Sequence, residues 1–332
     1  MKKIILLIFL IVASALFYLN IKNNISYNYK EPDIKQMIKA KTQNHYLDKE
    51  IKKAIESKNF DDVDSYLNLA KEFNITLLPQ TKKLIEKENT TSKKVLRGAK
   101  NFINGFISGE ANNSTQVAGA ITSDFTLYGD LRDITIEGKK YIEHKPYDKL
   151  ILGLSMAGVA LSATTLISFG SSSTLKVGTS SLKLAKKEKL LTKNFSKILS
   201  NKLDKSIDFR ALKSININSI SNIKKSLKIV KNSVNLKPLK PIFKNIHTIK
   251  NSTSLSDTIA LMKYIDNQKD LQKVAKLSKK YKKATRGIFK LFGKNIFRLV
   301  KAGIKWTLPL IISVLGFILS IFGIFIIILS PK

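Results

Sequence analysis

Apolar residues are concentrated in three runs, one near each end of the chain and one near its middle. The first run follows Lys2-Lys3 and extends from Ile4 to Leu19, so residues 1–20 are either an export signal or an uncleaved signal anchor. Ala13-Ser14-Ala15 has the small-x-small form of a cleavage site, but the apolar run continues beyond it. Because about sixteen apolar residues nearly span a bilayer, we favour the anchor.

The last run, residues 306–330, carries no charge and is long enough to predict a transmembrane helix. Trp306 begins it, as expected of an amphipathic aromatic residue at the membrane interface. The middle run, 150–170, is also uncharged but rich in Gly, Ala, Ser and Thr, so it is either a span or a buried helix. We favour the span. The sequence therefore predicts a mainly α-helical membrane protein with an N-terminal anchor, a middle span and a C-terminal transmembrane helix.

Helical periodicity predicts a small packing domain over residues 30–100. Two apolar stripes indicate a helical hairpin, the first formed by Leu47, Ile51, Ala54 and Ile55, the second by Val63, Tyr66, Leu67 and Ala70. Asn59 lies between the stripes and can cap the second helix, whereas Pro79 opens a third.

Two further regions surround the middle run. Residues 101–149 are richer in glycine and acidic groups and carry β-branched runs, so a helix is a weaker expectation there. Residues 171–287 form a basic helical region with a loop at 237–241. Its amphipathic character is clearest in the stretch Leu271, Val274, Leu277 and Tyr281.

The charge distribution favours three spans over two. Residues 21–148 carry about 21 basic and 18 acidic groups, and residues 149–305 carry about 34 and 6. If the middle run spans and the N-terminus is inside, the lysine-rich part returns to the cytoplasm, which agrees with the positive-inside bias. The domain around residue 60 would then lie outside.

Residues 288–305 are expected to form a helix that lies in the membrane interface and leads into the last span. Five basic residues recur at spacings of four, four, three and four, which places them on one helical face. With Trp306 they form the predicted membrane-surface set, Lys290, Lys294, Arg298, Lys301 and Lys305. The alternative is an amphipathic helix packed on the soluble domain. Within the span, a stripe of small residues would let another helix of this chain or of a second copy pack closely: Ser313, Gly316, Ser320 and Gly323.

The densest polar pattern consists of Asp124, Asp130, Arg132, Asp133, Glu137 and Asp148. If helical, Asp130, Asp133 and Glu137 share one face at i, i+3 and i+7. The favoured interpretation is a structural ion-pair motif in which Arg132 satisfies neighbouring carboxylates, and the alternative is a metal site held by those three carboxylates. No nucleophile, histidine or phosphate-binding loop accompanies the motif, so no catalytic residue, no cofactor and no enzymatic activity is predicted.

The same region carries a resemblance. Gly105-Phe106-Ile107-Ser108-Gly109-Glu110, Gly129-Asp130-Leu131-Arg132-Asp133, Glu137-Gly138 and the stretch from Asp148 to Leu154 occur in an order that resembles an uncharacterised family of proteobacterial membrane proteins. The resemblance implies an envelope membrane protein and no particular activity. The glycine- and acid-rich segment is also similar, over a short match, to the segment that precedes the toxic domain in some bacterial polymorphic toxins.

The net charge of +34 indicates anionic partners. Lysine dominates and arginine is scarce, so anionic lipid headgroups fit better than nucleic acid. Cysteine is absent, which excludes disulfides and thiolate sites. We expect a non-enzymatic protein of a bacterial inner membrane, a scaffold or adaptor that contacts the membrane surface and associates with a second copy through the last span. The alternative is a membrane-active effector or pore-forming protein.

Overall fold

The computed structural model describes residues 2–29, 31–88, 127–165, 171–215, 220–304 and 307–329. These residues are mainly α-helical, which confirms the predicted fold class at that level. The chain divides into two compact units. Unit 1 combines residues 1–31 with 298–332, and unit 2 comprises residues 32–297.

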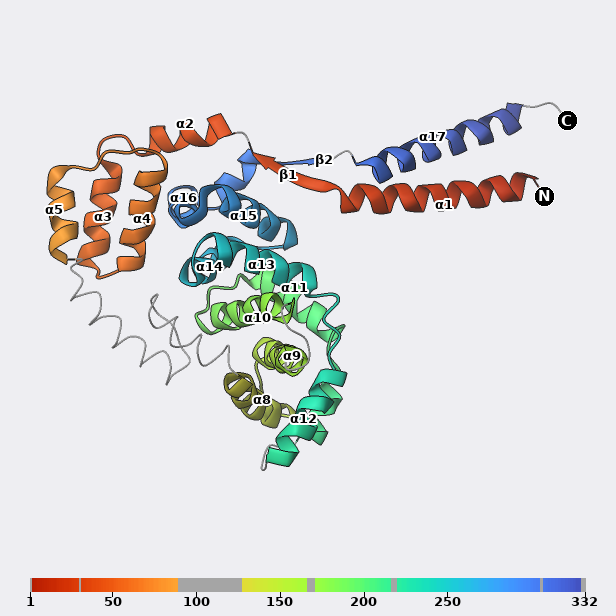
Figure 1. Ribbon diagram of the computed structural model, residues 1–332, viewed down its shortest axis with the longest axis horizontal. Coiled ribbons are helices and arrows are strands. Elements are labelled where there is room, and N and C mark those ends of the chain that lie inside the picture. Colours follow the sequence, from red (N-terminus) through yellow and green to blue (C-terminus); the bar gives the residue numbers. More distant parts are fainter. Residues whose placement is uncertain are drawn as a thin grey trace. The chain divides into compact units, whose positions relative to one another are not determined.

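Unit 1 brings the two ends of the chain together. Its elements are α1 (Lys2–Asn23), β1 (Ile25–Tyr29), β2 (Val300–Ile304) and α17 (Leu308–Leu329). The strands pair antiparallel, from Ile25 opposite Ile304 to Tyr29 opposite Val300. The two helices lie side by side and run in opposite directions, so that the start of α1 and the end of α17 are at the same end of the pair (Figure 1).

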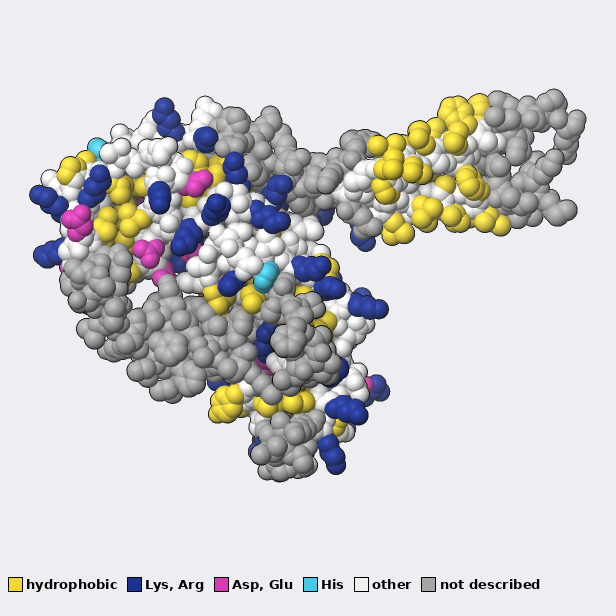
Figure 2. Space-filling view, in the orientation of Figure 1, with side chains coloured by type: hydrophobic (Ala, Val, Ile, Leu, Met, Phe, Trp, Pro, Cys, Tyr) yellow, Lys and Arg dark blue, Asp and Glu magenta, His cyan; other side chains and the backbone are white. Residues whose placement is uncertain are grey.

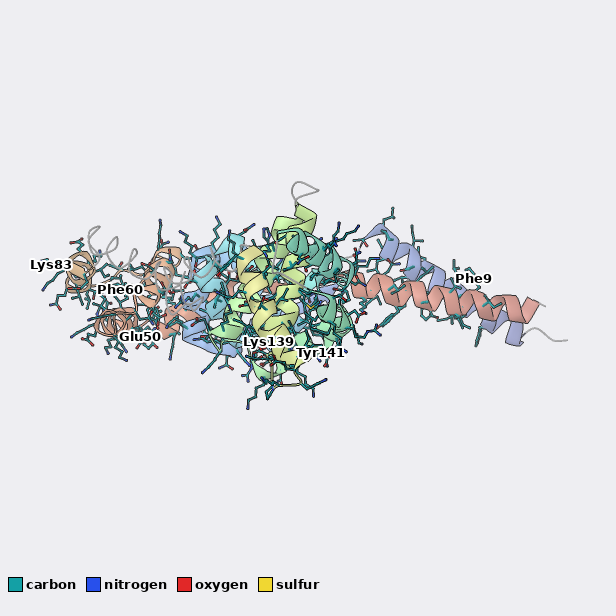
Figure 3. All side chains as sticks on the ribbon, turned by 90° about the horizontal axis from the view of Figure 1, so that it is seen from below. Phe9, Glu50, Phe60, Lys83, Lys139 and Tyr141 are labelled. Atoms are coloured by element: carbon teal, nitrogen blue, oxygen red, sulfur yellow. The ribbon has the colours of Figure 1, made fainter. Side chains whose placement is uncertain are left out.

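The α1–α17 pair has a packed inner side and an apolar outer side. Inside, the rings of Phe17 and Phe317 stack with their centroids 4.9 Å apart, and Ala13, Leu310 and Ser320 are buried. Outside, large hydrophobic side chains are exposed on both helices, among them Phe9 (Figure 3), Val12, Leu16, Ile312, Leu315, Leu319 and Phe322. Over the residues whose side chains the structure describes, no helix combines the length and hydropathy of a membrane span.

The first helices of unit 2 are α2 (Glu31–Lys41), α3 (Tyr46–Glu56), α4 (Phe60–Glu72) and α5 (Pro79–Glu88). The predicted hairpin is confirmed: the α3 stripe is buried, and so is most of the α4 stripe. Asn59 caps α4, because its side chain accepts a 3.2 Å hydrogen bond from the backbone N–H of Asp62. Pro79 is the first residue of α5, as predicted.

The remainder of unit 2 consists of helices, four of which pack around one apolar helix. Its longer helices are α8 (Leu127–Ile142), α9 (Lys149–Thr165), α10 (Ser171–Lys187), α11 (Lys193–Asp204), α12 (Ile220–Asn232), α13 (Lys240–Ser252) and α15 (Gln268–Tyr281). The short helix α14 (Leu255–Leu261) follows α13, and α16 (Thr285–Phe292) follows α15. The predicted stripe of α15 is buried.

The middle apolar run occupies the centre of this bundle. It forms α9, which packs against α8, α10, α11 and α12, and residues 150–161 are all buried. Because charged helices surround α9, its position agrees with the alternative of a buried helix and not with the favoured membrane span. Residues 166–170 of the run lie outside the described residues.

The expected continuous helix over residues 288–305 is wrong. The α-helix α16 ends at Phe292, and Gly293 follows with a φ of 54°, a left-handed backbone that glycine accepts without steric cost. A 3₁₀ segment, η4 (Gly293–Leu299), then leads into β2. The break prevents the basic residues of this segment from sharing one helical face.

Candidate functional site: a buried aspartate–lysine network

The acidic motif of α8 meets the lysines of α10 inside unit 2. The ammonium group of Lys183 lies 2.7 Å from Asp130 Oδ1 and 3.0 Å from Asp133 Oδ2. Lys176 also pairs with Asp130, and Lys187 lies 3.2 Å from Asp133. Two carboxylates of α8 therefore pair with three ammonium groups of α10, and α9 lies between these two helices in the chain.

Burial makes this network unusual. The side chain of Lys183 is 0% exposed and that of Asp130 is 1% exposed, so both charges depend on each other for solvation. Gly158 of α9 provides the space, because a Cβ there would lie 2.6 Å from the carboxyl carbon of Asp130. Its carbonyl oxygen also accepts a 3.2 Å hydrogen bond from Lys176. Three successive helices, α8, α9 and α10, thus hold the network.

The two carboxyls differ in pKa. Burial raises the pKa of Asp130 above its ordinary value, and the charges of Lys183 and Lys176 only partly offset that effect. Burial acts in the same direction on Asp133, but Lys183, Lys187 and Arg132 together outweigh it and hold the pKa of Asp133 below its ordinary value. Asp133 is the firmly ionised member of the pair.

Glu137 and Asp148 connect α8 to the start of α9 and do not join the network. Glu137 accepts a hydrogen bond from Lys140 at 2.7 Å and one from the backbone N–H of Asp148 at 2.6 Å. Asp148 caps α9 by accepting from the backbone N–H groups of Leu150 and Ile151. The predicted motif therefore divides into a buried network and a helix connection. Asp124 lies outside the described residues.

The geometry agrees with the predicted ion-pair motif, except that lysines of α10, in addition to Arg132, pair with the carboxylates. Arg132 does pair with Asp133, at 2.9 Å, but the lysines of α10 provide most of the compensating charge. Ammonium groups occupy the positions that a metal ion would need beside Asp130 and Asp133. Across the described part of the chain, no three His, Cys, Asp or Glu side chains are grouped to hold a metal ion.

A second network, absent from the sequence-based expectations, ties α4 to the end of unit 2. Arg286 of α16 lies 2.8 Å from Asp62 and 3.3 Å from Asp257, and Lys290 also pairs with Asp62. Asp62 and Asp257 stand in the first turns of α4 and α14. Carboxylates from the first turns of two helices thus pair with one guanidinium. No signal in the local sequence revealed this contact.

The predicted membrane-surface residues are dispersed. Lys290 pairs with Asp62, Lys294 pairs with Asp266, and Arg298 is exposed. Lys301 lies in β2 opposite Asn28, and residues 305 and 306 lie outside the described residues. The first two lysines are therefore committed to unit 2.

The predicted small-residue stripe lies partly between α1 and α17. Ser320 is buried, and Gly323 is half-buried. Ser313 and Gly316 line a groove of about 440 Å³ between the two helices, together with apolar residues of α1. Within this chain, α17 therefore packs closely against α1.

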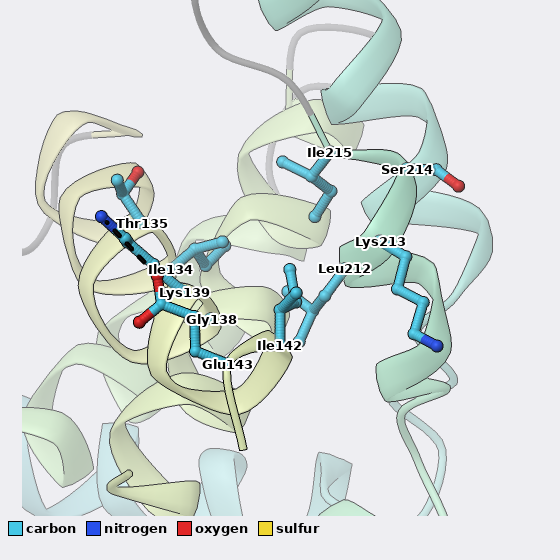
Figure 4. A pocket seen from close by; sticks show the side chains of 10 residues that line it. All are labelled: Ile134, Thr135, Gly138, Lys139, Ile142, Glu143, Leu212, Lys213, Ser214 and Ile215. Carbon is cyan, nitrogen blue, oxygen red and sulfur yellow. Dashed lines mark ion pairs between the residues drawn. The ribbon is translucent and has the colours of Figure 1, made fainter. Parts of the chain in front are cut away.

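A surface groove of about 470 Å³ lies between α8 and η1 (Phe209–Ser214) (Figure 4). Its floor is apolar, with Ile134 and Leu212, and Lys139 and Glu143 form a 3.7 Å ion pair at its edge. A hydrogen bond from Lys145 lowers the pKa of Glu143, so this carboxyl is ionised at neutral pH and is a poor proton donor. The groove offers apolar contact more than acid–base chemistry.

No protein-family model matches the chain, and comparisons with curated proteins and with solved structures find no similar protein. The resemblances noted from the sequence therefore stay predictions.

Proposed function

We propose that this chain is a non-enzymatic scaffold of a bacterial inner membrane, in which α1 and α17 are two membrane helices and unit 2 lies entirely on one side. The antiparallel pairing of these helices carries the proposal, because it brings together the most apolar segments of the two ends of the chain. Their outer faces expose large hydrophobic side chains (Figure 2). Water-exposed apolar patches on monomers rarely exceed a few hundred Å².

The length of α17 supports the proposal. It comprises 22 residues without a charged side chain, and about 20 such residues span a bilayer. The antiparallel β1–β2 ribbon satisfies backbone groups where the chain enters and leaves the pair. Thr307 Oγ1 donates a 3.1 Å hydrogen bond to Asn24 Oδ1 at the same end of the helices. Two spans joined in this way form one anchor.

A scaffold role agrees with the chemistry of unit 2. The carboxyls of Asp130, Asp133 and Asp257 have shifted pKa values, and each of them is held in an ion pair. Structural ion-pair networks shift carboxyl pKa values in this way, so we assign these groups to holding the helices in position. The function that this arrangement supports is the presentation of a rigid, basic helical domain at the membrane.

Charged substitutions on the outer face of α17 test the membrane role. Leu315 and Leu319 are exposed and lie one helical turn apart. In the Leu315→Lys/Leu319→Lys variant we expect partial release from membranes by alkaline carbonate, whereas the wild-type chain stays in the pellet, because each lysine costs about 3 kcal/mol near a span's centre.

Tyr128→Lys provides the control, since it places the same charge at an exposed hydrophobic position of α8 in unit 2. This variant should remain in the pellet. Release of the wild-type chain by carbonate, or equal retention of the double variant, would contradict the proposal.

A further inference from the structure

One segment of unit 2 contains many basic residues and no acidic one, and of these basic residues Arg210 pairs with Asp208 just outside the segment, at 2.8 Å. Residues 209–256, called the acid-free segment below, contain ten basic residues and no acidic one. The basic residues are Arg210, Lys213, Lys224, Lys225, Lys228, Lys231, Lys237, Lys240, Lys244 and Lys250. The segment comprises η1, α12 and α13, and its residues 216–219 lie outside the described part.

Packing turns several lysines of this segment outward. The helix α12 packs against α9 and buries Ser226 and Val230, which leaves Lys225 and Lys228 exposed. The helix α13 packs against α10 and α15 through a buried apolar face. Lys240 and Lys244 stand one turn apart on its exposed side. The buried apolar faces of α12 and α13 therefore determine that these lysines point into solvent.

The end of α11 places one further basic residue beside this segment. Ile207 and Val234 form an antiparallel bridge, and the backbone N–H of Asn235 donates a 2.7 Å hydrogen bond to Ser206 O. This contact sets Lys205 beside the turn between α12 and α13. Lys and Arg side chains predominate along the margin of unit 2 where α11 and α12 lie (Figures 1 and 2).

Several lysines elsewhere in unit 2 are neutralised within the chain. Lys149, Lys183 and Lys186, for example, pair with aspartates at 2.5 to 3.0 Å. Among the described residues, the exposed lysines of α12 and α13 have no such ion pair. Because like charges held together repel one another, an uncompensated cluster favours an anionic partner.

The side chains indicate which anion fits. Arginine, which forms bidentate contacts with phosphates and bases, occurs once in the segment. The aromatic rings needed for base stacking are withdrawn, since Phe243 is buried and Phe209 is partly buried. Flexible, exposed ammonium groups on a helical surface suit the headgroups of an anionic bilayer, with about 1 kcal/mol for each lysine near the surface.

We propose that the described part of the acid-free segment, through the exposed lysines of α12 and α13, is the surface of unit 2 that binds anionic lipid headgroups. This proposal rests on the proposed membrane function and adds the site and the chemistry of its partner. Contact would hold unit 2 against a bilayer rich in acidic lipids and release it at high ionic strength.

The test uses the full chain held in nanodiscs of phosphatidylcholine and measures its binding to vesicles that contain phosphatidylglycerol. In Lys228→Glu/Lys240→Glu/Lys244→Glu we expect roughly hundredfold weaker binding, since each lost lysine contributes about fivefold. The control is Lys49→Glu/Lys52→Glu/Lys83→Glu, which changes the net charge equally at exposed lysines of α3 and α5 (Lys83 in Figure 3). It should bind as tightly as the wild type.

Equal weakening by both triple variants would overturn the proposal, because binding would then follow net charge alone. Tighter binding of a short DNA duplex, abolished by the same Lys228, Lys240 and Lys244 changes, would overturn it in favour of nucleic acid. Failure of the chain to enter nanodiscs contradicts the proposed membrane function separately, and the vesicle comparison is then made with the disc-free chain.

Discussion

Lys183 is the residue on which the buried network depends most. It contacts both Asp130 and Asp133 and has no exposed surface, so its removal leaves two carboxylates with less compensation in a medium of low polarity. The lowered pKa of Asp133 means that its ionised form stabilises the fold above the ordinary pKa, and that this contribution is lost as the pH falls through the lowered value. The pKa of Asp130 is raised, so its protonated form stabilises the fold below the ordinary pKa, and this contribution is lost as the pH rises through the raised value.

Lys183→Met should therefore lower the free energy of unfolding by about 3 to 5 kcal/mol, as expected when one partner of a buried ion pair is removed. The double variant Asp130→Asn/Lys183→Met should lose less than the sum of the single variants, because it removes charge from both sides. Thermal melts of the four proteins in detergent provide the comparison.

Lys139→Met is the matched control, since Lys139 forms an exposed ion pair with Glu143 and should be dispensable. If Lys183→Met were as stable as this control, the buried network would have no structural role.

The sequence predicted the acidic half of this network but not the basic half. Asp130, Asp133 and Arg132 stood out because they lie close together in the chain. Lys176 and Lys183 lie 46 and 53 residues from Asp130 in the chain, in a lysine-rich stretch where nothing local distinguishes them from exposed lysines. These two lysines reach the aspartates only because α8 and α10 both pack against α9.

The close approach of α10 and α13 depends on a glycine. A Cβ at Gly178 would lie 2.6 Å from the Cα of Phe243, a backbone atom that cannot move without shifting α13. Gly138 of α8 differs, because a Cβ there would lie 3.4 Å from a side-chain methyl group of Leu212, an ordinary contact. Close packing therefore requires a glycine at position 178, whereas position 138 has room for a methyl group.

Gly178→Ala should destabilise unit 2 by about 1 to 3 kcal/mol through overpacking. Gly138→Ala should stabilise it by about 0.5 to 1 kcal/mol, because alanine loses less backbone freedom than glycine in a helix. Thermal unfolding of both variants, followed by circular dichroism, tests the pair. A neutral Gly178→Ala variant would show that α10 and α13 are not in close contact.

Sequence periodicity predicted elements well where the pattern was local. The stripes of α3, α4 and α15 are buried as expected, and Asn59 and Pro79 begin helices. The expected helix over residues 288–305 is wrong because its spacing counted through Gly293, whose left-handed backbone ends α16. The pairing of β2 with β1 lay beyond any local signal, since the two strands come from opposite ends of the chain.

For the whole molecule, the burial of α9 inside unit 2 favours two spans over the three that the charge distribution indicated. With two spans, the twenty residues after α1 and the twenty before α17 lie on one side and carry Lys30, Lys35, Lys39, Lys41, Lys290, Lys294, Arg298, Lys301 and Lys305. Lys2 and Lys3, at the start of α1, would lie on the other side. For the proposed two-span anchor, the positive-inside bias therefore predicts that unit 2 faces the cytoplasm.

The most direct test of this account is the labelling of single cysteines in intact cells, which is straightforward because the chain has none. Lys83→Cys and Lys228→Cys place thiols at exposed positions of α5 and α12, and Lys332→Cys marks the end that follows α17. A membrane-impermeant maleimide should label residue 332 in intact cells and residues 83 and 228 only after lysis. Labelling of residue 83 from outside while residue 228 stays protected would contradict the two-span account.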